Sequence, residues 1–161
     1  MEKRIYFDQL QDLMLNAGRS DRGRANLNTH DSLDATVQRL FIATDPDTYI
    51  RPHRHSEANK WEFFVLLEGA MDLLIFDDDG TIIERSRMSR SELRAVEIPP
   101  GQWHSYVCSE PGTLALEIKQ DGYIPTPAAD FAPWAPAEGT AEAQPFLAWM
   151  RDAEVGTGPH R

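Results

Sequence analysis

The sequence predicts a mainly β protein, a double-sheet jelly roll flanked by a short helix on the N-terminal side and an arm on the C-terminal side. From residue 35 to residue 120, apolar side chains recur with a period of two, which is the period of a strand. Gly, Pro and Asp residues interrupt this pattern at short intervals, as they do between short strands. Because no helical pattern separates the strands, two packed antiparallel sheets are expected.

Residues 1–34 are expected to form a helix and a polar arm. Apolar side chains at helical spacing predict the helix over residues 8–17. Asn26, Asn28 and His30 then occupy alternate positions and share one face if the chain is extended. This polar face either points to solvent or lines the mouth of a barrel.

The segment 35–120 is expected to form the β-barrel. Phe63 to Leu67 is apolar on both faces, so this strand must be covered twice, by the barrel interior and by either a terminal arm or a second subunit. We therefore expect a homodimer. The predicted strands are 36–43, 48–53, 61–67, 70–76, 81–87, 94–98, 103–108 and 113–119.

Residues 121–161 complete what is expected to be one domain overall. The sequence Phe131-Ala-Pro-Trp-Ala-Pro136 is too aromatic for a disordered linker and too rich in proline for a regular element. It is expected to be an arm strapped over the barrel. Apolar side chains at helical spacing predict a second helix over about 140–152.

Composition excludes several partners. The 161 residues include 26 acidic and 16 basic side chains, and the formal net charge of −10 repels nucleic acid and anionic membranes. The single cysteine cannot form an internal disulfide, and the first residues contain no apolar targeting segment. The expected location is therefore the cytoplasm.

Three histidines and one glutamate are the candidate metal ligands. His53 and His55 are two positions apart and project from one face of an extended segment, and His104 follows a Pro-Gly turn. Glu62 precedes the apolar run of the next strand and is the preferred carboxylate. Two alternatives remain: Glu57 as the carboxylate, or three histidines completed by water.

A mixed nitrogen and oxygen ligand set suits one divalent ion, either Fe, Mn, Ni, Co or Zn. Cys108 lies four positions beyond His104 and should share its face at greater depth. It is interpreted as a buried apolar residue, and as a ligand it would favour zinc or copper.

Basic side chains near these histidines suggest an anionic substrate. Arg51 has the strand parity of His53 and His55, and we expect it to form an anion clamp with Lys60. Arg39 is also assigned to substrate binding.

Further polar residues are assigned by proximity. Tyr49 and His30 are candidate substrate-binding residues and proton donors, and Tyr106 is a candidate proton donor. Glu117 and Lys119 share a face and are expected to support each other as a pair.

These residues carry a resemblance to the cupin superfamily. His53-x-His55 with Glu62 and Gly69 resembles the first cupin motif, and Pro99-x-Gly101-x-x-His104 resembles the second. The loop between His55 and Glu62 is longer than the family usually has, and Cys108 replaces an asparagine. The resemblance implies a double-stranded β-helix barrel that binds metal through these four ligands.

A narrower resemblance is to the WbuC-type cupin metalloproteins. Its signature is similar to several stretches here, namely Arg51-Pro-His-Arg-His55, Trp61-Glu-x-Phe64, Glu97-Ile-Pro-Pro-Gly-x-Trp-His104, Glu117-x-Lys119 and 131–136, with 26–30 and Gln38-Arg39 upstream. That resemblance implies an enzyme for a small anionic sugar- or acid-type molecule, linked to bacterial surface-polysaccharide metabolism, with isomerase and dioxygenase chemistry both open. The alternative is a non-catalytic module that binds or senses a small molecule through its metal.

Overall fold

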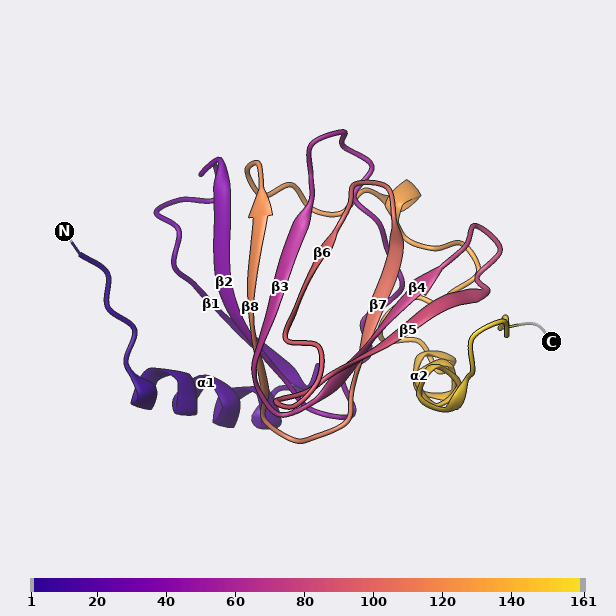
Figure 1. The fold of residues 1–161 in the computed structure, drawn as a ribbon, viewed down its shortest axis with the longest axis horizontal. Helices are drawn as coiled ribbons and strands as arrows, with labels where there is room; N and C mark the ends of the chain where they lie inside the picture. Colours follow the sequence, from indigo (N-terminus) through magenta and orange to yellow (C-terminus); the bar gives the residue numbers. More distant parts are fainter. Residues whose placement is uncertain (1, 160–161) are drawn as a thin grey trace.

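The computed structural model describes residues 2–159, which contain two α-helices, one short 3-10 helix (Ala128–Asp130) and eight strands (Figure 1). In chain order the α-helices and strands are α1 (Phe7–Arg19), β1 (Arg24–Asn28), β2 (Val37–Thr44), β3 (Glu62–Glu68), β4 (Met71–Phe76), β5 (Ile82–Met88), β6 (Ala95–Ile98), β7 (Trp103–Cys108), β8 (Thr113–Gln120) and α2 (Ala143–Asp152).

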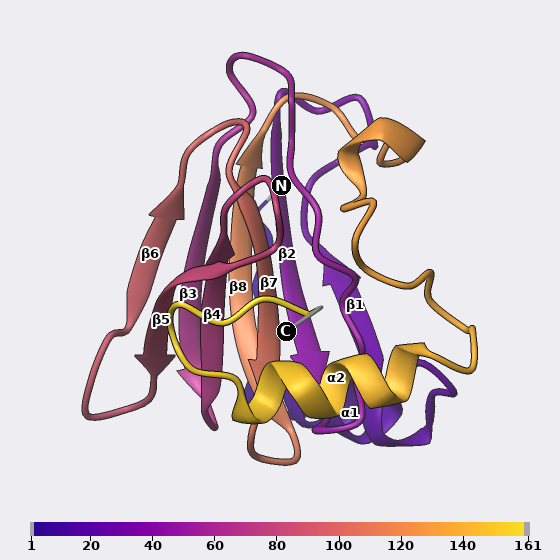
Figure 2. The same ribbon diagram turned by 90° about the vertical axis from the view of Figure 1, so that its right-hand side faces the viewer.

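The strands form two antiparallel sheets, as the fold class predicted. The larger sheet has the order β1-β2-β8-β3-β6, and the smaller has the order β5-β4-β7. Figure 2 shows the smaller sheet in front of the larger one, with α2 crossing the strands. No helix in the described part of the chain is both long enough and apolar enough to cross a membrane.

The strand predictions agree with the structure to within one residue at each end, with one exception. The predicted strand 48–53 is wrong, because only His53 forms an isolated bridge there. Pro52 has no amide hydrogen to donate, which prevents a continuous ladder. Residues 24–28, which were expected only to be polar, form the edge strand β1.

The space between the sheets holds one core, and its residues come from inward-facing positions of both. Phe64 and Tyr106 stack across the sheets with ring centroids 4.3 Å apart. The buried members are Phe64, Leu66, Met71, Leu73, Ile75, Met88, Ile98, Tyr106 and Ala115.

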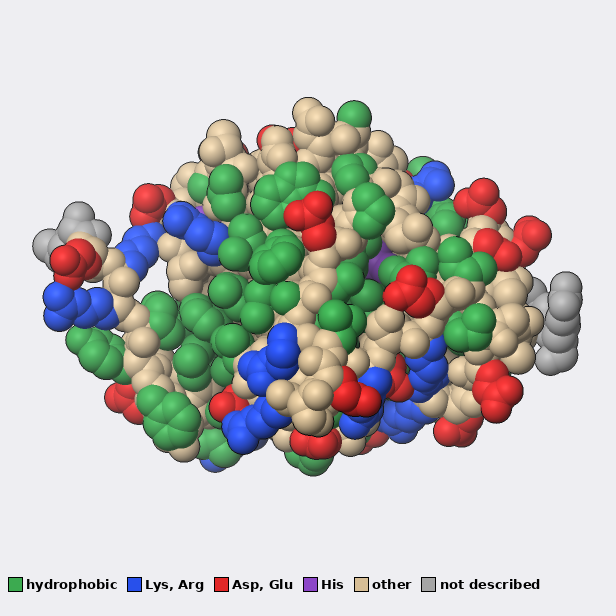
Figure 3. Space-filling model, in the orientation of Figure 1, with side chains coloured by type: hydrophobic (Ala, Val, Ile, Leu, Met, Phe, Trp, Pro, Cys, Tyr) green, Lys and Arg blue, Asp and Glu red, His purple; other side chains and the backbone are tan. Residues whose placement is uncertain are grey.

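Helix α1 covers part of the outer face of the larger sheet. Its Leu13 and Ala17 pack on Ala43 and Leu114. The rest of that face carries half-buried apolar side chains that the helix does not reach. Figure 3 shows hydrophobic surface gathered over β2, β8 and β3, above α1.

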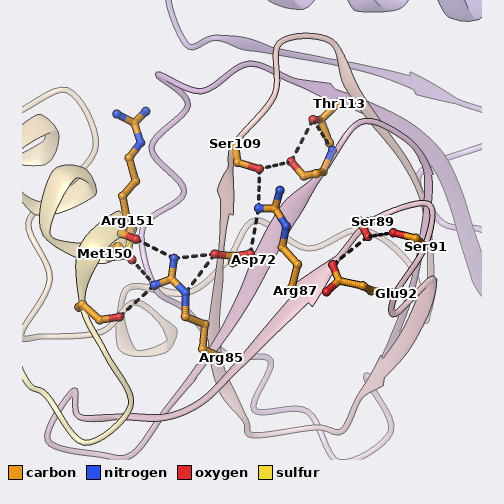
Figure 4. Close-up of polar contacts among 12 residues, drawn as sticks. Asp72, Arg85, Arg87, Ser89, Ser91, Glu92, Ser109, Thr113, Met150 and Arg151 are labelled. Carbon is orange, nitrogen blue, oxygen red and sulfur yellow. Dashed lines mark hydrogen bonds and ion pairs between the residues drawn. The ribbon is translucent and has the colours of Figure 1, made fainter.

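Helix α2 and the C-terminal arm cover the outer face of the smaller sheet. Leu147 and Met150 of α2 are fully buried against Phe76 and Ile82. Arg85 of β5 fixes the end of the helix, because its guanidinium donates to the carbonyls of Met150, Arg151 and Ala153 (Figure 4).

The predicted hairpin turn at 77–80 is present between β4 and β5. Gly80 has a φ of +83°, and a Cβ added there would lie 2.6 Å from the Trp134 ring. Glycine is therefore required both by the backbone and by the close approach of the arm.

Candidate metal centre

His53 and His104 are held opposite each other by the backbone. The amide of His53 donates to the carbonyl of His104 at 3.0 Å, and the amide of His104 donates back at 2.9 Å. His53 also bridges Phe131 of the arm. The histidine segment is thus fixed between β7 and the arm, although it is not a regular strand.

The backbone around His55 is anchored on both sides. Its carbonyl accepts the amide of Gly101 at 2.7 Å, which joins the predicted Pro-Gly turn to the histidine segment. Asp130 is 2% exposed and accepts hydrogen bonds from Ser56 and Arg54. These contacts position the start of the long loop before Glu62.

Glu62 is the first residue of β3 and is the carboxylate at the site. Its Oε1 lies 2.9 Å from His55 Nε2, and its Oε2 lies 3.1 Å from His104 Nε2. Glu57 instead lies beside Lys60, with Oε1 3.5 Å from Nζ. The structure therefore places Glu62, and not Glu57, among the histidines.

The four candidate ligands converge. His53, His55, Glu62 and His104 each offer one ligand atom, and these atoms all lie within 4.8 Å of one another. Nitrogen and oxygen ligands at this spacing can share one divalent ion. The residues come from two strands of different sheets and one irregular segment, so folding is needed to assemble the group.

Hydrogen bonds orient two of the imidazoles. His53 Nδ1 donates to the carbonyl of Arg51 at 3.0 Å, and His104 Nδ1 donates to the carbonyl of Gln102 at 2.9 Å. Each bond fixes the tautomer and leaves Nε2 with a free lone pair, as in metal-binding histidines.

The Nε2 atoms of His55 and His104 are buried and have no partner with hydrogen-bond geometry among residues 2–159. His55 Nε2 nevertheless lies 2.9 Å from Glu62 Oε1, and His104 Nε2 lies 3.1 Å from Glu62 Oε2. Buried, unpaired nitrogen atoms that surround a carboxylate fit a metal ion as their common partner.

Burial and neighbouring charges set the protonation of the group. Burial and the neighbouring His104 lower the pKa of His53 to about 3, so its imidazole is neutral at neutral pH. Burial raises the pKa of Glu62, but the His104 and His55 imidazoles outweigh it and hold that pKa well below its usual value. Burial lowers the pKa of His104, and contact with Glu62 reverses this to a net increase.

A cavity of about 180 Å³ adjoins the cluster between the two sheets. His53 and Glu62 line it at one side, and Ile50, Phe64 and Met71 supply apolar wall. Such a cavity suits a small molecule rather than a polymer.

Glu117 and Lys119 project from β8 into this cavity and form the predicted pair. Lys119 Nζ lies 2.5 Å from Glu117 Oε1 and 3.4 Å from Glu62 Oε1. Burial raises the pKa of Glu117, and the nearby Lys119 opposes that increase only in part. Lys119 therefore links the cluster to the cavity wall.

Tyr106 and Cys108 line the cavity beyond His104, as strand parity predicted for the cysteine. The Tyr106 hydroxyl is buried and has no hydrogen-bond partner among the described residues. Cys108 Sγ donates to the carbonyl of Glu110 at 3.1 Å. The cysteine is not one of the four clustered ligands.

Arg51 and Lys60 have different partners and do not line this cavity. Arg51 donates to the carbonyl of Ala132, with its guanidinium 5.2 Å from the Phe131 ring centroid. Lys60 is buried and donates to the carbonyl of Gly122 at 3.3 Å. Both contact the C-terminal arm, and Arg51 also lines a neighbouring pocket with His53, so the anion clamp stays a prediction.

None of the other predicted substrate-binding residues lines the metal cavity. Arg39 is exposed on the outer face of β2 and is not a cavity residue. Tyr49 is buried and donates its hydroxyl to the carbonyl of Pro136 at 2.9 Å. His30 lies in a second pocket with Asn26 and Asn28.

Two residues that contribute to the site, Arg24 and Asp130, were not identified from the sequence. Arg24 lines the cavity and the second pocket, and its alternation with Asn26 and Asn28 along β1 could have indicated this. Asp130 gave no periodic signal, because it lies in an irregular arm and becomes important only where that arm meets the histidine segment.

Sequence comparison identifies one family. Residues 5–88, just over half of the chain, match the family model described as a domain of unknown function (DUF6016). No curated protein matches the chain in sequence.

Several solved structures are similar to this chain in fold. KdgF from Halomonas sp. has 17% identity and a TM-score of 0.51, with 64% of this chain and 84% of that chain covered. Protein SO0799 from Shewanella oneidensis has 10% identity and a TM-score of 0.51, with 65% and 72% covered.

Oxalate decarboxylase from Bacillus subtilis, in a structure concerned with its Mn(II) centres, has 17% identity and a TM-score of 0.50. The alignment covers 69% of this chain but only 28% of that enzyme. At these identities the likeness establishes the cupin jelly-roll fold.

Proposed function

The chain belongs to the family described as a domain of unknown function (DUF6016), and from that premise we propose that it is a cupin metalloprotein that acts on a small anionic molecule. His53, His55, Glu62 and His104 would hold one divalent ion, and the adjoining cavity would hold the substrate.

The observation that carries this proposal is the convergence of four ligand atoms within 4.8 Å. Two of the imidazoles are oriented through Nδ1 by backbone carbonyls. A structural role alone does not account for buried Nε2 atoms that lack partners of hydrogen-bond geometry within residues 2–159.

Charge favours an anionic substrate. One carboxylate neutralises only half of a divalent cation, and the adjacent Lys119 and Glu117 cancel each other. The assembled site therefore retains net positive charge in an apolar cavity, which an anion would balance.

When bound, a divalent ion supplies Lewis-acid polarisation of a ligand oxygen. The chain's own residues would orient the substrate: the Tyr106 hydroxyl has no hydrogen-bond partner within residues 2–159 and could bind the substrate, and Lys119 contacts Glu62. The apolar walls of Phe64 and Met71 exclude water from the reacting group.

The resemblance to WbuC-type proteins supports an anionic sugar or acid derivative, and a place in bacterial surface-polysaccharide metabolism, as the finer assignment. Mn(II) centres in the oxalate decarboxylase neighbour support manganese as one candidate ion beside Fe, Ni, Co and Zn.

Elemental analysis of purified protein tests the metal centre. We expect about one divalent ion per chain, and the loss of most of it in His104→Ala and Glu62→Gln. His30→Ala and Glu57→Gln are matched controls outside the cluster and should retain the metal. Equal retention in all four variants would contradict the assignment.

A second measurement separates an enzyme from a binding module. The metal-loaded protein is mixed with sugar acids, sugar phosphates and 2-oxo acids, and both product formation and the melting temperature are followed. Turnover supports an enzyme. A raised melting temperature without turnover, under every metal tried, favours the binding module.

A further inference from the structure

A second pocket of about 460 Å³ opens beside the metal cavity. The two share Arg24, Ile42, Glu117 and Lys119 as common wall. The second pocket is nearer the edge of the sheet, where β1 contributes Asn26 and Asn28. The two pockets are therefore adjacent, and a ligand that occupied both would pass along these four side chains.

Strand register gives the path between the two pockets. Glu62 of β3 pairs with Lys119 of β8, and Glu117 on the same face of β8 pairs with Leu40 of β2, which pairs with Asn28 of β1. Three strand spacings separate β3 from β1, a distance of roughly 14 Å. A ligand that reaches both ends is elongated.

Polar atoms in the second pocket are available for a ligand. Asn26 Nδ2 donates to Asn28 Oδ1 at 2.7 Å, which leaves the Asn26 side-chain oxygen and the Asn28 side-chain NH2 group without another partner in the described part of the chain. His30 Nε2 is buried there without a partner among the described residues. By contrast, Gln38 already donates to backbone carbonyls of Leu33 and Ala35.

These groups suit neutral hydroxyls. A pair of amides supplies one acceptor and one donor side by side, as two neighbouring hydroxyl groups require. The cations at this end, Arg22 and Arg24, are already paired with Glu138. Tyr123 is 51% exposed and offers an aromatic wall to the face of a sugar ring.

We infer that the second pocket binds the neutral, hydroxyl-bearing part of an elongated ligand whose anionic end lies at the metal. This inference rests on the proposed function. It assigns the ligand class as an acidic sugar linked to a further hydroxylated unit.

Isothermal titration calorimetry of the metal-loaded protein tests this with two probes, D-glucuronate and a disaccharide of glucuronate and glucose. The disaccharide should bind about 10-fold more tightly, since two added hydrogen bonds are sufficient for that ratio. Asn28→Ala should abolish the difference and leave glucuronate affinity within about 2-fold, while the exposed Asn16→Ala on α1 should change neither.

Equal affinity for the two probes would overturn the inference about the second pocket, and so would an equal loss of affinity for both in Asn28→Ala. Either result would leave the proposed metal site intact. If neither probe binds, the inference about the second pocket is overturned, while the elemental analysis and the wider ligand screen still decide the proposed function. If glucuronate binds equally well before and after metal removal, the proposed function fails, and with it the placement of the anionic end at the metal.

Discussion

At the scale of single residues, the site depends on which polar groups share a face and a cavity. Glu62 and Glu57 are both glutamates after His55, but only Glu62 begins a strand that faces the histidines. Lys119 is placed opposite Glu62 by strand register, and Glu117 is two residues away on the same face.

Removal of only one charge from the Lys119–Glu117 pair is expected to lower the free energy of unfolding. Lys119→Met leaves Glu117 buried without its cation and should lower the free energy of unfolding by about 3 kcal/mol. The double variant Lys119→Met/Glu117→Leu removes both charges and should recover most of that loss. Urea unfolding of the metal-free proteins measures both, and a double variant no better than the single one would contradict this.

At the scale of elements, the arm and α2 act as covers held by specific polar contacts. Arg85 joins the carbonyls that end α2 to Asp72, with Nη2 2.6 Å from Asp72 Oδ2 (Figure 4). Arg87 binds the other Asp72 oxygen from a more exposed position. The two arginines thus offer a matched comparison.

Arg85→Ala should lower the free energy of unfolding by about 2–3 kcal/mol, because three helix-end carbonyls and a partly buried carboxylate lose charged donors. Arg87→Ala should lower the free energy of unfolding by less than about 1 kcal/mol, as expected for an exposed ion pair. The rate of amide hydrogen exchange over residues 143–152 should rise only in the Arg85 variant. Equal effects of both substitutions would show that Arg85 does not hold the helix.

At the scale of the whole molecule, Glu138 ties the C-terminal arm to β1. Burial raises its pKa, but hydrogen bonds from Arg22 and Arg24 outweigh burial and lower it from 4.5 to about 2. Because the folded pKa is the lower one, the stabilisation is full above about pH 4.5 and is lost as the pH falls toward 2.

Glu138→Gln should therefore lower the free energy of unfolding by on the order of 1 kcal/mol at pH 7, after allowance for solvent screening. Near pH 2 the same substitution should leave that free energy almost unchanged. Urea unfolding of both proteins between pH 7 and pH 2 measures the difference. The exposed Glu154→Gln serves as the control and should show no such trend. A constant difference across the range would contradict the linkage.

The outer face of the larger sheet remains partly uncovered, and we propose that a second copy covers it. Across this face, register places Arg39, Ile118, Phe63 and Glu97 in one row. Neither Arg39 nor Glu97 forms an ion pair within the described residues. A two-fold axis would set each Arg39 opposite the partner's Glu97 around an apolar centre.

Analytical ultracentrifugation should accordingly give twice the chain mass of 18.2 kDa. Phe63→Glu should give the monomer mass, because it places charge at the centre of the apolar row. Ile83→Glu, at an exposed apolar residue of β5, should leave the mass unchanged. A monomeric wild-type protein would contradict the dimer.

The sequence by itself determined the strands from β2 to β8, because period-two alternation and turn residues are local signals, but it missed β1 and placed a strand at 48–53 that does not form. It also indicated the candidate ligands, since the spacing of His53 and His55 and the Pro-Gly turn before His104 are visible in the chain, although the histidine segment is not the strand that was predicted. The longer loop before Glu62 left the carboxylate open between two residues.

Only the tertiary structure decided which cations face the cavity. Arg51 lies beside Pro52 in an irregular segment, where parity no longer fixes the direction of a side chain, and the arm takes up both Arg51 and Lys60. Lys119 faces Glu62 instead, through the pairing of β3 with β8, although the two residues are 57 positions apart in the chain. Such pairings follow from sheet order, which local periodicity does not encode.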